Sequence, residues 1–558
     1  MSQAAAGYVS VDLLEMEDGI LRIDGTVSRT LLQQGNLEAR ADGRRIPLRL
    51  TKRYAQVTLE KETDTDRTAF AAEIPKEQLP CSRKKECLLE FVLLDAAGSE
   101  TVLPVLFVSY QSRLHSELSQ SWWHMGPRLM AVQRKSGGRS YGLSIRRAGA
   151  VKMALQELRF LKEILCAPNG SKQMFLIRCL YWLAYPFYCG KNIWITFDKL
   201  YKGGDCGEYF YKYMCSRKDG NVEPAYVING SAPDCRRLRE EGYRPLAYRS
   251  VKQRLSYLYA NMVFGTHSGV NSFCGFNNWE IRFVQDRLRA VNTCIQHGLS
   301  VQDLSADSNR IVNNNKRYYC AARCEIENLS KPAYDYHPGT LRLTGIPRYD
   351  GLANDDRKQI LITPTWRSYL AVHSVMGEAR GYNPAFRDTE YFRIYQSLIR
   401  NRKLIETAKR YGYRIVYLLH PVISAQKQDF ACPEGVEILA SSEAGYEMLL
   451  RQSSLMVTDY SGVQFDFAYM RKPVVYFHPE ELPPHYADGG FSYETQGFGE
   501  ICIGLETLVD TVCGYLENDC AVKAVYRARQ DDFFAYSDRE NCRRIYEDAL
   551  QLAGKARS

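Results

Sequence analysis

Residues 454–470 read Ser-Leu-Met-Val-Thr-Asp-Tyr-Ser-Gly-Val-Gln-Phe-Asp-Phe-Ala-Tyr-Met. An apolar run ends at Thr458, a polar turn follows, and residues 464–470 continue with the texture of a short helix. A buried strand that leads through a polar turn into a helix is the repeating unit of doubly wound parallel sheets. Ligands bind such sheets at the carboxyl ends of their strands. The turn after Thr458 is therefore the first place to expect a site.

The same alternation of strands and helix-length segments extends over the chain from residue 191. Apolar strands are expected first at 193–197, 225–228 and 262–266, and then at 359–363, 414–419, 454–458 and 472–477. Two consecutive series predict two doubly wound, Rossmann-like domains, over residues 191–358 and 359–558. We see no internal repeat and no low-complexity tract.

Residues 1–112 have the texture of a small β-sandwich. Short runs of β-branched and apolar residues at 21–27, 55–59 and 87–94 are separated by breaks that contain Asp or Gly. No cluster of catalytic residue types is evident there, so an accessory binding or packing role is expected. The predicted fold class is α/β, with a pair of doubly wound parallel-sheet domains preceded by a small β-sandwich domain.

Residues 113–190 are unusually basic and are predicted to be a helical region. Residues 128–163 include nine Lys or Arg and two acidic side chains, and apolar residues recur at helical spacing over 153–165. A basic amphipathic helix is typical of a segment that lies on an anionic membrane surface. An ordinary helix packed on the next domain is an equal alternative. The apolar run 174–189 carries a charge and a proline and is too short to cross a bilayer.

The composition narrows the class of protein. The chain has 558 residues, of which 45% are hydrophobic and 25% charged, as in a globular protein. This length suggests about three domains. The formal charge of +9 fits an anionic substrate, a membrane surface or nucleic acid. Scattered cysteines without a CxxC pair indicate reduced thiols in a cytoplasmic protein, and no secretion signal is visible. No zinc-type spacing is present, so no metal site is expected.

The turn after Thr458 has the chemistry of a phosphate site. Asp459 and Ser461 are good N-cap residues, and the exposed amides of a helix start favour an anion. Ser461 adds a hydroxyl donor, and Gly462 allows close approach of the backbone. The carboxylates of Asp459 and Asp466 are expected to bind a hydroxyl or to orient a neighbour. A capped helix with nothing bound is the alternative for these residues alone.

Polar residues also follow three other predicted strands. Arg367, after Thr363-Pro364-Thr365-Trp366, carries a planar fork of donors that matches phosphate oxygens. His420 is a candidate neutral donor to a phosphate or a leaving group. His297, in a loop flanked by glycine, has an intrinsic pKa near working pH and could take a proton from an acceptor hydroxyl. A surface ion pair for Arg367 and a structural role for His420 are the alternatives.

In this order the clusters resemble the CDP-glycerol glycerophosphotransferase family, which includes teichoic acid primases and polymerases. The resemblance covers approximately residues 190–535. It is carried by His297-Gly298, Thr363-Pro364-Thr365-Trp366-Arg367, His420-Pro421, Thr458-Asp459-Tyr460-Ser461-Gly462 with Phe465-Asp466-Phe467, Lys472-Pro473-Val474-Val475-Tyr476-Phe477, and Gly204-Asp205-Cys206-Gly207-Glu208.

The resemblance implies a GT-B fold with a helical region that docks peripherally on the cytoplasmic face of the cell membrane. It implies that His297 is the general base, with Gly298 and Gln302 on the acceptor side. His420 is the second implied catalytic residue. The donor pyrophosphate and glycerol are assigned to Thr365, Arg367, His420, Thr458, Asp459, Ser461, Gly462 and Asp466.

The implied reaction joins an acceptor hydroxyl to the donor phosphorus distal to the cytidine, and CMP leaves. The implied partners are CDP-glycerol or a related CDP-polyol, a lipid-linked teichoic acid or capsule-type polymer, and an anionic membrane surface. No cofactor, metal or nucleic acid is expected.

The chain departs from the family pattern on both sides of the expected site. Gln296 stands where the family usually has Trp, Leu299-Ser300-Val301-Gln302 replaces its Thr-Pro-Leu-Lys, and Gly462 replaces a Ser. A ribitol phosphate donor is therefore an alternative to glycerol phosphate. Two other functions remain open: a GT-B glycosyltransferase that uses a nucleotide sugar, and a non-catalytic, membrane-associated polymer-binding protein.

Overall fold

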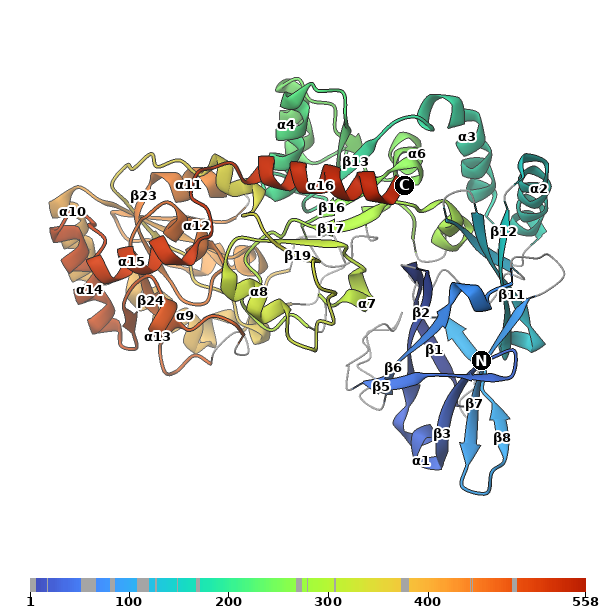
Figure 1. Ribbon diagram of the computed structural model, residues 1–558. Helices are drawn as coiled ribbons and strands as arrows, with labels where there is room; N and C mark the ends of the chain where they lie inside the picture. Colours follow the sequence, from blue (N-terminus) through green and yellow to red (C-terminus); the bar gives the residue numbers. More distant parts are fainter. Residues whose placement is uncertain are drawn as a thin grey trace.

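The structure is a computed structural model whose described residues form four sheets (Figure 1). Two largely antiparallel sheets lie in the N-terminal part, and two parallel sheets follow residue 190. The residues described are 7–17, 19–51, 67–80, 86–107, 120–125, 128–147, 149–166, 171–266, 273–277, 280–305, 308–372, 381–441, 443, 445–483 and 489–557.

The two N-terminal sheets form a sandwich around one core. The first has the order β5-β6-β2-β1-β9, and the second β10-β11-β12-β7-β3-β4 with β8 beside β7. Side chains such as Ile23, Phe70 and Phe91 meet between them. The elements are β1 Val9–Glu17, β2 Ile20–Ser28, α1 Arg29–Gln34, β3 Gly35–Ala41, β4 Arg44–Ile46, β5 Leu48–Thr51, β6 Arg67–Pro75, β7 Cys87–Asp95, β8 Glu100–Val102, β9 Val105–Phe107, β10 Gln120–Met125, β11 Arg128–Lys135 and β12 Ser140–Arg147.

The sandwich extends beyond residue 112, and the prediction of a helical region from 113 onward was wrong for residues 120–147, which form β10, β11 and β12. Along β11 and β12 the residues that face the core recur at every second position, which is the period of a strand and not of a helix. The alternating residues that join the sandwich core are Met130, Val132, Tyr141, Leu143 and Ile145. The predicted strands at 21–27 and 87–94 are confirmed, whereas the one at 55–59 lies outside the described residues.

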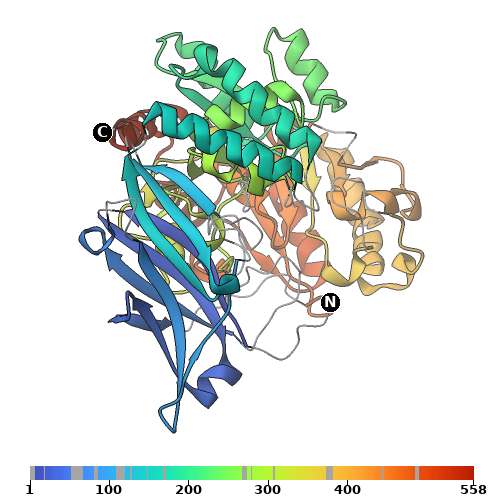
Figure 2. The ribbon, with the colours of Figure 1, turned by 90° about the vertical axis from the view of Figure 1, so that its right-hand side faces the viewer.

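Two helices, α2 (Ala150–Cys166) and α3 (Lys172–Tyr188), lie side by side after the sandwich (Figure 2). The helix predicted over 153–165 is thus present. Arg178 of α3 forks onto Glu157 of α2 at 2.7 and 2.6 Å, and it also reaches Asp286 and the Phe283 carbonyl oxygen at 2.7 Å each. Within the described residues, none of the helices has the length and apolar content needed to span a bilayer.

Both parallel sheets have the strand order of a Rossmann fold. The first sheet is β15-β14-β13-β16-β17-β18-β19, and its order reverses between β13 and β16; the second is β22-β21-β20-β23-β24-β25, and its order reverses between β20 and β23. The strands are β13 Ile193–Phe197, β14 Glu223–Ile228, β15 Leu246–Ala247, β16 Met262–Gly265, β17 Val291–Cys294, β18 Arg317–Cys320, β19 Leu341–Leu343, β20 Gln359–Ile362, β21 Arg414–Leu418, β22 Val436–Leu439, β23 Ser453–Thr458, β24 Val474–Phe477 and β25 Ile501–Cys502. The predicted strands of both series are confirmed.

Helices flank both parallel sheets, and neighbouring residues of β20, Ile360 and Leu361, join different buried clusters. The helices of the first domain are α4 Cys206–Arg217, α5 Pro233–Glu240, α6 Val251–Tyr259, α7 Arg310–Asn313 and α8 Arg323–Leu329. Those of the second are α9 Glu390–Ile399, α10 Arg402–Tyr411, α11 Tyr446–Gln452, α12 Val463–Tyr469, α13 Tyr493–Gln496, α14 Leu505–Glu517 and α15 Ala524–Phe533.

The last helix, α16 (Asn541–Arg557), leaves the second parallel-sheet domain and crosses back over the first (Figure 1). Its Asp548 accepts hydrogen bonds from Arg317 at 2.9 Å and from Tyr319 at 3.1 Å. Its Tyr546 packs on Trp194 of β13. The C-terminal end of the chain therefore holds the two domains together.

The sandwich is fastened to the first parallel-sheet domain by ion pairs. Arg310 of α7 binds Asp24 of β2 at 2.9 Å, and both side chains are buried. Lys316 binds Glu15 of β1 at 2.8 Å. The sandwich is thus a docked part of the molecule.

We expect Arg178→Met to destabilise the protein by about 3–5 kcal/mol, because the buried carboxylates of Glu157 and Asp286 then keep only Arg287 as a counter-ion, and one buried negative charge is left uncompensated. Urea unfolding followed by tryptophan fluorescence measures the change. Arg402→Met is the matched control, since Arg402 pairs with Glu406 while its side chain is 90% exposed. That control should shift stability by no more than about 0.5 kcal/mol. Equal losses in both variants would contradict the prediction.

Candidate active site

The predicted polar clusters lie at the carboxyl ends of strands beside the two points where strand order reverses. In the first sheet the relevant residues are Thr266 after β16 and His297 after β17; in the second they are Thr365 and Arg367 after β20, His420 after β21, and 459–462 after β23. These are the positions at which doubly wound sheets bind ligands.

His297 has the tautomer that a base requires. Its Nδ1 lies 2.9 Å from the carbonyl oxygen of Thr266, and because a carbonyl only accepts, Nδ1 carries the hydrogen. The lone pair of the neutral ring is then on Nε2. The ring is open to solvent on one side, but the surrounding protein desolvates it and lowers its pKa below 6.5, although Asp205 opposes this shift. At pH 7 the ring is therefore neutral, with its lone pair on Nε2.

A buried hydrogen-bond network supports the His297 loop. Gln296 has a positive φ of 57° and donates from Nε2 to the Tyr319 carbonyl oxygen at 2.6 Å and to Glu325 at 2.9 Å. Ser300 donates its amide hydrogen to Glu325 at 2.9 Å and its hydroxyl to Gln296 at 2.6 Å. Two residues that depart from the family pattern thus act together to hold the loop in shape.

The two residues expected on the acceptor side have different surroundings. A Cβ added at Gly298 would meet no atom within 4 Å, so the backbone there is open. The carbonyl oxygen of Gln302 accepts a hydrogen bond from Asn328 at 2.8 Å. The structure thus gives the backbone of Gln302 a supporting contact within the loop.

On the other sheet, the ends of β20 and β23 are joined through Asp459. Its carboxylate accepts the Thr365 amide at 2.7 Å and Arg367 Nη1 at 2.8 Å. Arg367 is buried and also donates to the carbonyl oxygen of Pro483 at 3.0 Å. The Thr458 hydroxyl donates to the Thr363 carbonyl oxygen at 2.8 Å. Arg367 is thus a buried ion-pair member and not a surface one, and Thr458 braces the strand ends.

The expectation that Asp459 or Ser461 caps the following helix was wrong. Helix α12 begins at Val463, its N-cap is Gly462, and no side chain caps it. Asp459 is held instead across the sheet by the Arg367 guanidinium and the Thr365 amide, which both make charge-assisted hydrogen bonds to its carboxylate. A Cβ added at Gly462 would meet no atom within 4 Å, so the turn is open on this side.

Buried polar atoms beside this ion pair can serve a ligand. Thr365 Oγ1 and Arg367 Nη2 are buried and have no hydrogen-bond partner among the described residues. Nearly all such atoms are satisfied in folded proteins, so a hydroxyl and an N–H here suit a phosphate or polyol oxygen. The Ser461 hydroxyl, which is partly exposed, is likewise without a hydrogen bond to any described residue.

His420 has the opposite tautomer to His297. Its Nδ1 accepts the Val422 amide at 3.2 Å, so the neutral ring carries its hydrogen on Nε2. The ring also stacks with Trp366, with centroids 6.1 Å apart. The neutral ring of His420 therefore carries an N–H donor at Nε2, and its predicted role as a donor to a ligand stays a prediction.

Sequence reasoning missed Arg348, a side chain near the site with four hydrogen bonds. Arg348 lies in the segment between β19 and β20, and its Nε and Nη2 each donate to Asp466 at 2.6 Å. Its Nη1 donates to Asp205 at 2.9 Å and to the carbonyl oxygen of His297. Both carboxylate oxygens of Asp466 therefore accept hydrogen bonds from Arg348. Arg348 ends no strand and belongs to none of the polar clusters at the strand ends, so no local signal marked it.

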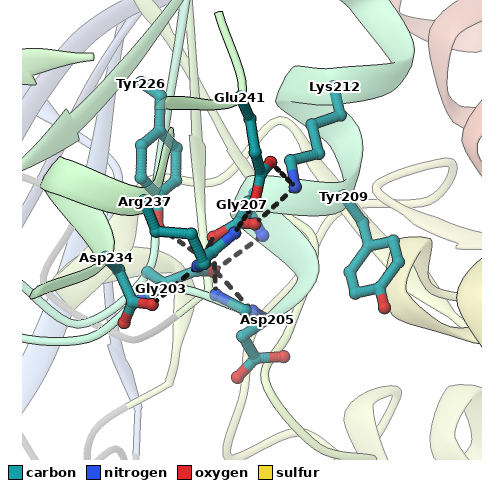
Figure 3. Close-up of polar contacts among 12 residues, drawn as sticks. Gly203, Asp205, Gly207, Tyr209, Lys212, Tyr226, Asp234, Arg237 and Glu241 are labelled. Carbon is teal, nitrogen blue, oxygen red and sulfur yellow. Dashed lines mark hydrogen bonds and ion pairs between the residues drawn. The ribbon is translucent and has the colours of Figure 1, made fainter. Parts of the chain in front are cut away.

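Asp205 belongs to a rigid turn at the start of α4 (Figure 3). Asp198 accepts the amide hydrogens of Gly207 at 2.7 Å and of Glu208 at 3.0 Å. Glu208 in turn accepts from Arg237 at 2.7 Å. The carboxylates are thus occupied by N–H donors. In the part of the chain that the structure describes, no group of three or more His, Cys, Asp or Glu is placed to hold a metal ion.

Comparison with known proteins identifies the family of this chain. Residues 191–551 match the family model described as CDP-Glycerol:Poly(glycerophosphate) glycerophosphotransferase. The chain belongs to this family. It is 34% identical over 406 residues to Minor teichoic acid biosynthesis protein GgaB of Bacillus subtilis (strain 168). That match covers 71% of this chain but 45% of the relative, so the chain spans less than half of that protein's length.

Two further likenesses point the same way. Teichoic acid poly(glycerol phosphate) polymerase of Bacillus subtilis (strain 168) is 27% identical over 158 residues, which cover 25% of this chain and 19% of that protein. A solved structure of a histidine-to-alanine variant of the Wall Teichoic Acid Polymerase TagF superposes with a TM-score of 0.50 at 15% identity and covers 73% of this chain and 99% of that chain. The structural likeness concerns the fold alone, and it supports the predicted GT-B-like architecture.

We expect the imidazole of His297 to titrate below pH 6.5 with its hydrogen on Nδ1, because desolvation disfavours the imidazolium. Nitrogen NMR of the protein labelled at histidine measures both properties, and His297→Gln assigns the signal. A midpoint at or above 6.5, or a hydrogen on Nε2 in the neutral form, would contradict the assignment.

Proposed function

We propose that this protein transfers glycerol phosphate, or a similar polyol phosphate, from a CDP-activated donor to a hydroxyl of a membrane-linked teichoic acid or capsule-type polymer, and releases CMP. The observation that carries the proposal is that His297 and His420, which follow strands of the two parallel sheets, have opposite tautomers. His297 offers a basic Nε2, while His420 offers an N–H beside the buried donors of Thr365 and Arg367. Membership of the family supplies the donor class.

In the proposed reaction, Nε2 of His297 takes the proton of the acceptor hydroxyl. The acceptor oxygen forms a bond to the donor phosphorus distal to the cytidine, and the bond from that phosphorus to the bridging oxygen breaks, so that CMP carries away the bond's electron pair. The proton leaves His297 for solvent. Charge on the transferred phosphate would be stabilised by Arg367 Nη2, by the Nε2 hydrogen of His420 and by the open turn at Gly462.

For the alcohol of the donor we propose only a class, a small polyol, whereas the reaction is proposed in full. Gly462 leaves more room than the serine of the family pattern, and no atom lies within 4 Å of the position where its Cβ would stand. This space suits a polyol as small as glycerol or somewhat larger, such as ribitol. Thr365 Oγ1 and the Ser461 hydroxyl are the nearby groups that could bind its hydroxyls.

A donor screen tests the reaction class directly. The full chain is incubated with an acceptor polymer and, separately, with CDP-glycerol, CDP-ribitol, a UDP-sugar and a CMP-sugar, and the released nucleotide is identified. We expect CMP from a CDP-polyol and no release of UDP. UDP from a UDP-sugar would instead support a glycosyltransferase, and no turnover with any donor would support a polymer-binding protein.

We expect His297→Ala to lower kcat by roughly 10²–10⁴-fold, the range for loss of a general base, while the fold is retained. Circular dichroism and the thermal transition check the fold. His337→Ala is the control, because His337 lies 3.0 Å from Arg22 at the contact with the sandwich and belongs to none of the strand-end clusters. Full turnover by His297→Ala would rule out its role as base.

We propose further that α2 and α3 lie on the anionic cytoplasmic leaflet as a peripheral anchor. Large apolar side chains project from both helices: Val151 is 76% exposed, Leu158 63%, Leu183 71% and Phe187 73%. Exposed apolar residues gathered on adjacent helices mark an interaction surface. The exposed basic side chains of the same helices suit anionic headgroups; they are Arg159, Lys162 and Lys172.

Replacing Val151, Leu158 and Phe187 together by Ser should weaken binding to phosphatidylglycerol vesicles at least about tenfold, since burial of one such side chain contributes about 1.5–3 kcal/mol. Vesicle co-sedimentation measures the binding. Val525→Ser in α15 is the control, because Val525 is comparably exposed in the second parallel-sheet domain. Unchanged binding of the triple variant would mean that another surface meets the membrane.

A further inference from the structure

We infer that Arg348 is a positioning residue, which holds the loop of the base His297 in register with the donor-side helix α12 across the two parallel-sheet domains. This inference rests on the proposed function for the roles of the groups that it aligns. The contacts themselves come from three segments that are far apart in the sequence.

Nearly all of the N–H groups of Arg348 donate hydrogen bonds. Its Nε and Nη2 form a fork on the two oxygens of Asp466, and its Nη1 is shared by Asp205 and the carbonyl oxygen of His297. Four of the five N–H groups of a guanidinium can be accounted for in this way. The side chain is 13% exposed, so these bonds form largely out of water, where charge-assisted pairs are strong and directional.

Each partner of Arg348 controls one part of the site. Asp205 is the N-cap of α4, and its Oδ1 accepts the Cys206 amide at 2.8 Å. The His297 carbonyl belongs to the loop that carries the base. Asp466 lies on α12, directly after the open turn at Gly462. A shift of the guanidinium would therefore move the base relative to the donor turn.

The segment that carries Arg348 is itself clamped. The short helix η7 (Pro347–Gly351) places Tyr349 in a stack with Tyr469 of α12, with centroids 4.4 Å apart. On its other side, Asp350 accepts the amides of Asn541 and Cys542 at 2.9 and 2.8 Å, at the start of α16. The backbone at Arg348 is thus held between α12 of the second parallel-sheet domain and the start of α16, the helix that crosses back over the first domain.

Lysine cannot replace this arginine in geometry, although it keeps the charge. An ammonium group has no planar fork and cannot bind Asp466 through two parallel bonds while it reaches Asp205. The charge also matters for His297. The charged groups that face its ring are Asp205, which raises its pKa, and Lys199 and Arg348, which lower it. Loss of the cation should therefore raise the pKa of the base.

The test compares Arg348→Lys and Arg348→Met in the full chain. We expect Arg348→Lys to lower kcat on the order of 100-fold, the effect of misplacing a reacting group by about 1 Å. The KM for the CDP-polyol should stay within a few-fold of the wild-type value. Because the base works only when neutral, the rate falls below its pKa. That acid limb should stay in place for Arg348→Lys and move to higher pH for Arg348→Met.

Arg317 supplies the matched control. It is also 13% exposed and also binds a carboxylate, Asp548, at 2.9 Å, but it does not touch the His297 loop. Arg317→Lys and Arg317→Met should leave kcat and the pH profile unchanged. If Arg348→Met does not fold, Arg348→Lys and Asp466→Asn carry the test. Wild-type kcat in Arg348→Lys, or an unmoved acid limb in folded Arg348→Met, would overturn the inference.

Hydrogen exchange separates this inference from the proposed function. Peptides that cover residues 296–300 should exchange faster in Arg348→Lys than in Arg317→Lys, because the loop loses its outer support. If the wild-type protein turns over no donor, the proposed function fails, yet this measurement still decides about Arg348. Equal exchange in the two variants would show that Arg348 does not hold the loop.

Discussion

One guanidinium group, that of Arg348, binds carboxylates of both parallel-sheet domains and the backbone of the loop that carries His297. A largely buried arginine is tolerable only when such partners surround it, and the buried carboxylate of Asp466 is tolerable only with a cation beside it. The three segments are therefore interdependent: α4, the His297 loop and α12 keep their places together. The hydrophobic cluster shared by Phe264, Tyr349 and Phe465 closes the same interface with apolar contacts.

The strand order of the two sheets explains why the polar groups face one another at all. In each sheet the order of the strands reverses at one point, and the strand ends beside that point leave room for a ligand. The first sheet places His297 there, and the second places the Arg367–Asp459 pair and the turn at Gly462. The backbone holds Nδ1 in both histidines, but His297 donates from it to a carbonyl oxygen, whereas His420 accepts an amide hydrogen at it. This small difference makes one a candidate base and the other a candidate donor.

The two helices before the parallel sheets are connected to this arrangement by a second buried arginine. Arg178 joins α2, α3 and Asp286, which precedes β17 and the His297 loop. The exposed apolar side chains of α2 and α3 thus belong to the same rigid framework as the proposed base. Under the proposed function, a protein anchored through these helices would present its base at a fixed height above the lipid headgroups that carry the acceptor.

Local patterns in the sequence determined the parallel sheets, because apolar runs, breaks and helix-length spacers are properties of neighbouring residues. They also located the strand-end residues His297, Arg367, His420 and Asp459, since strand ends are visible in the same patterns. The period-two signal of β11 and β12 was present as well but was hidden by their basic residues. What only the tertiary structure decided is which polar groups pair. Arg348 meets Asp466 across 118 positions, and Arg367 meets Asp459 across 92. Such pairs form because the fold brings distant carboxylates and cations together out of water, and no spacing along the chain encodes that meeting.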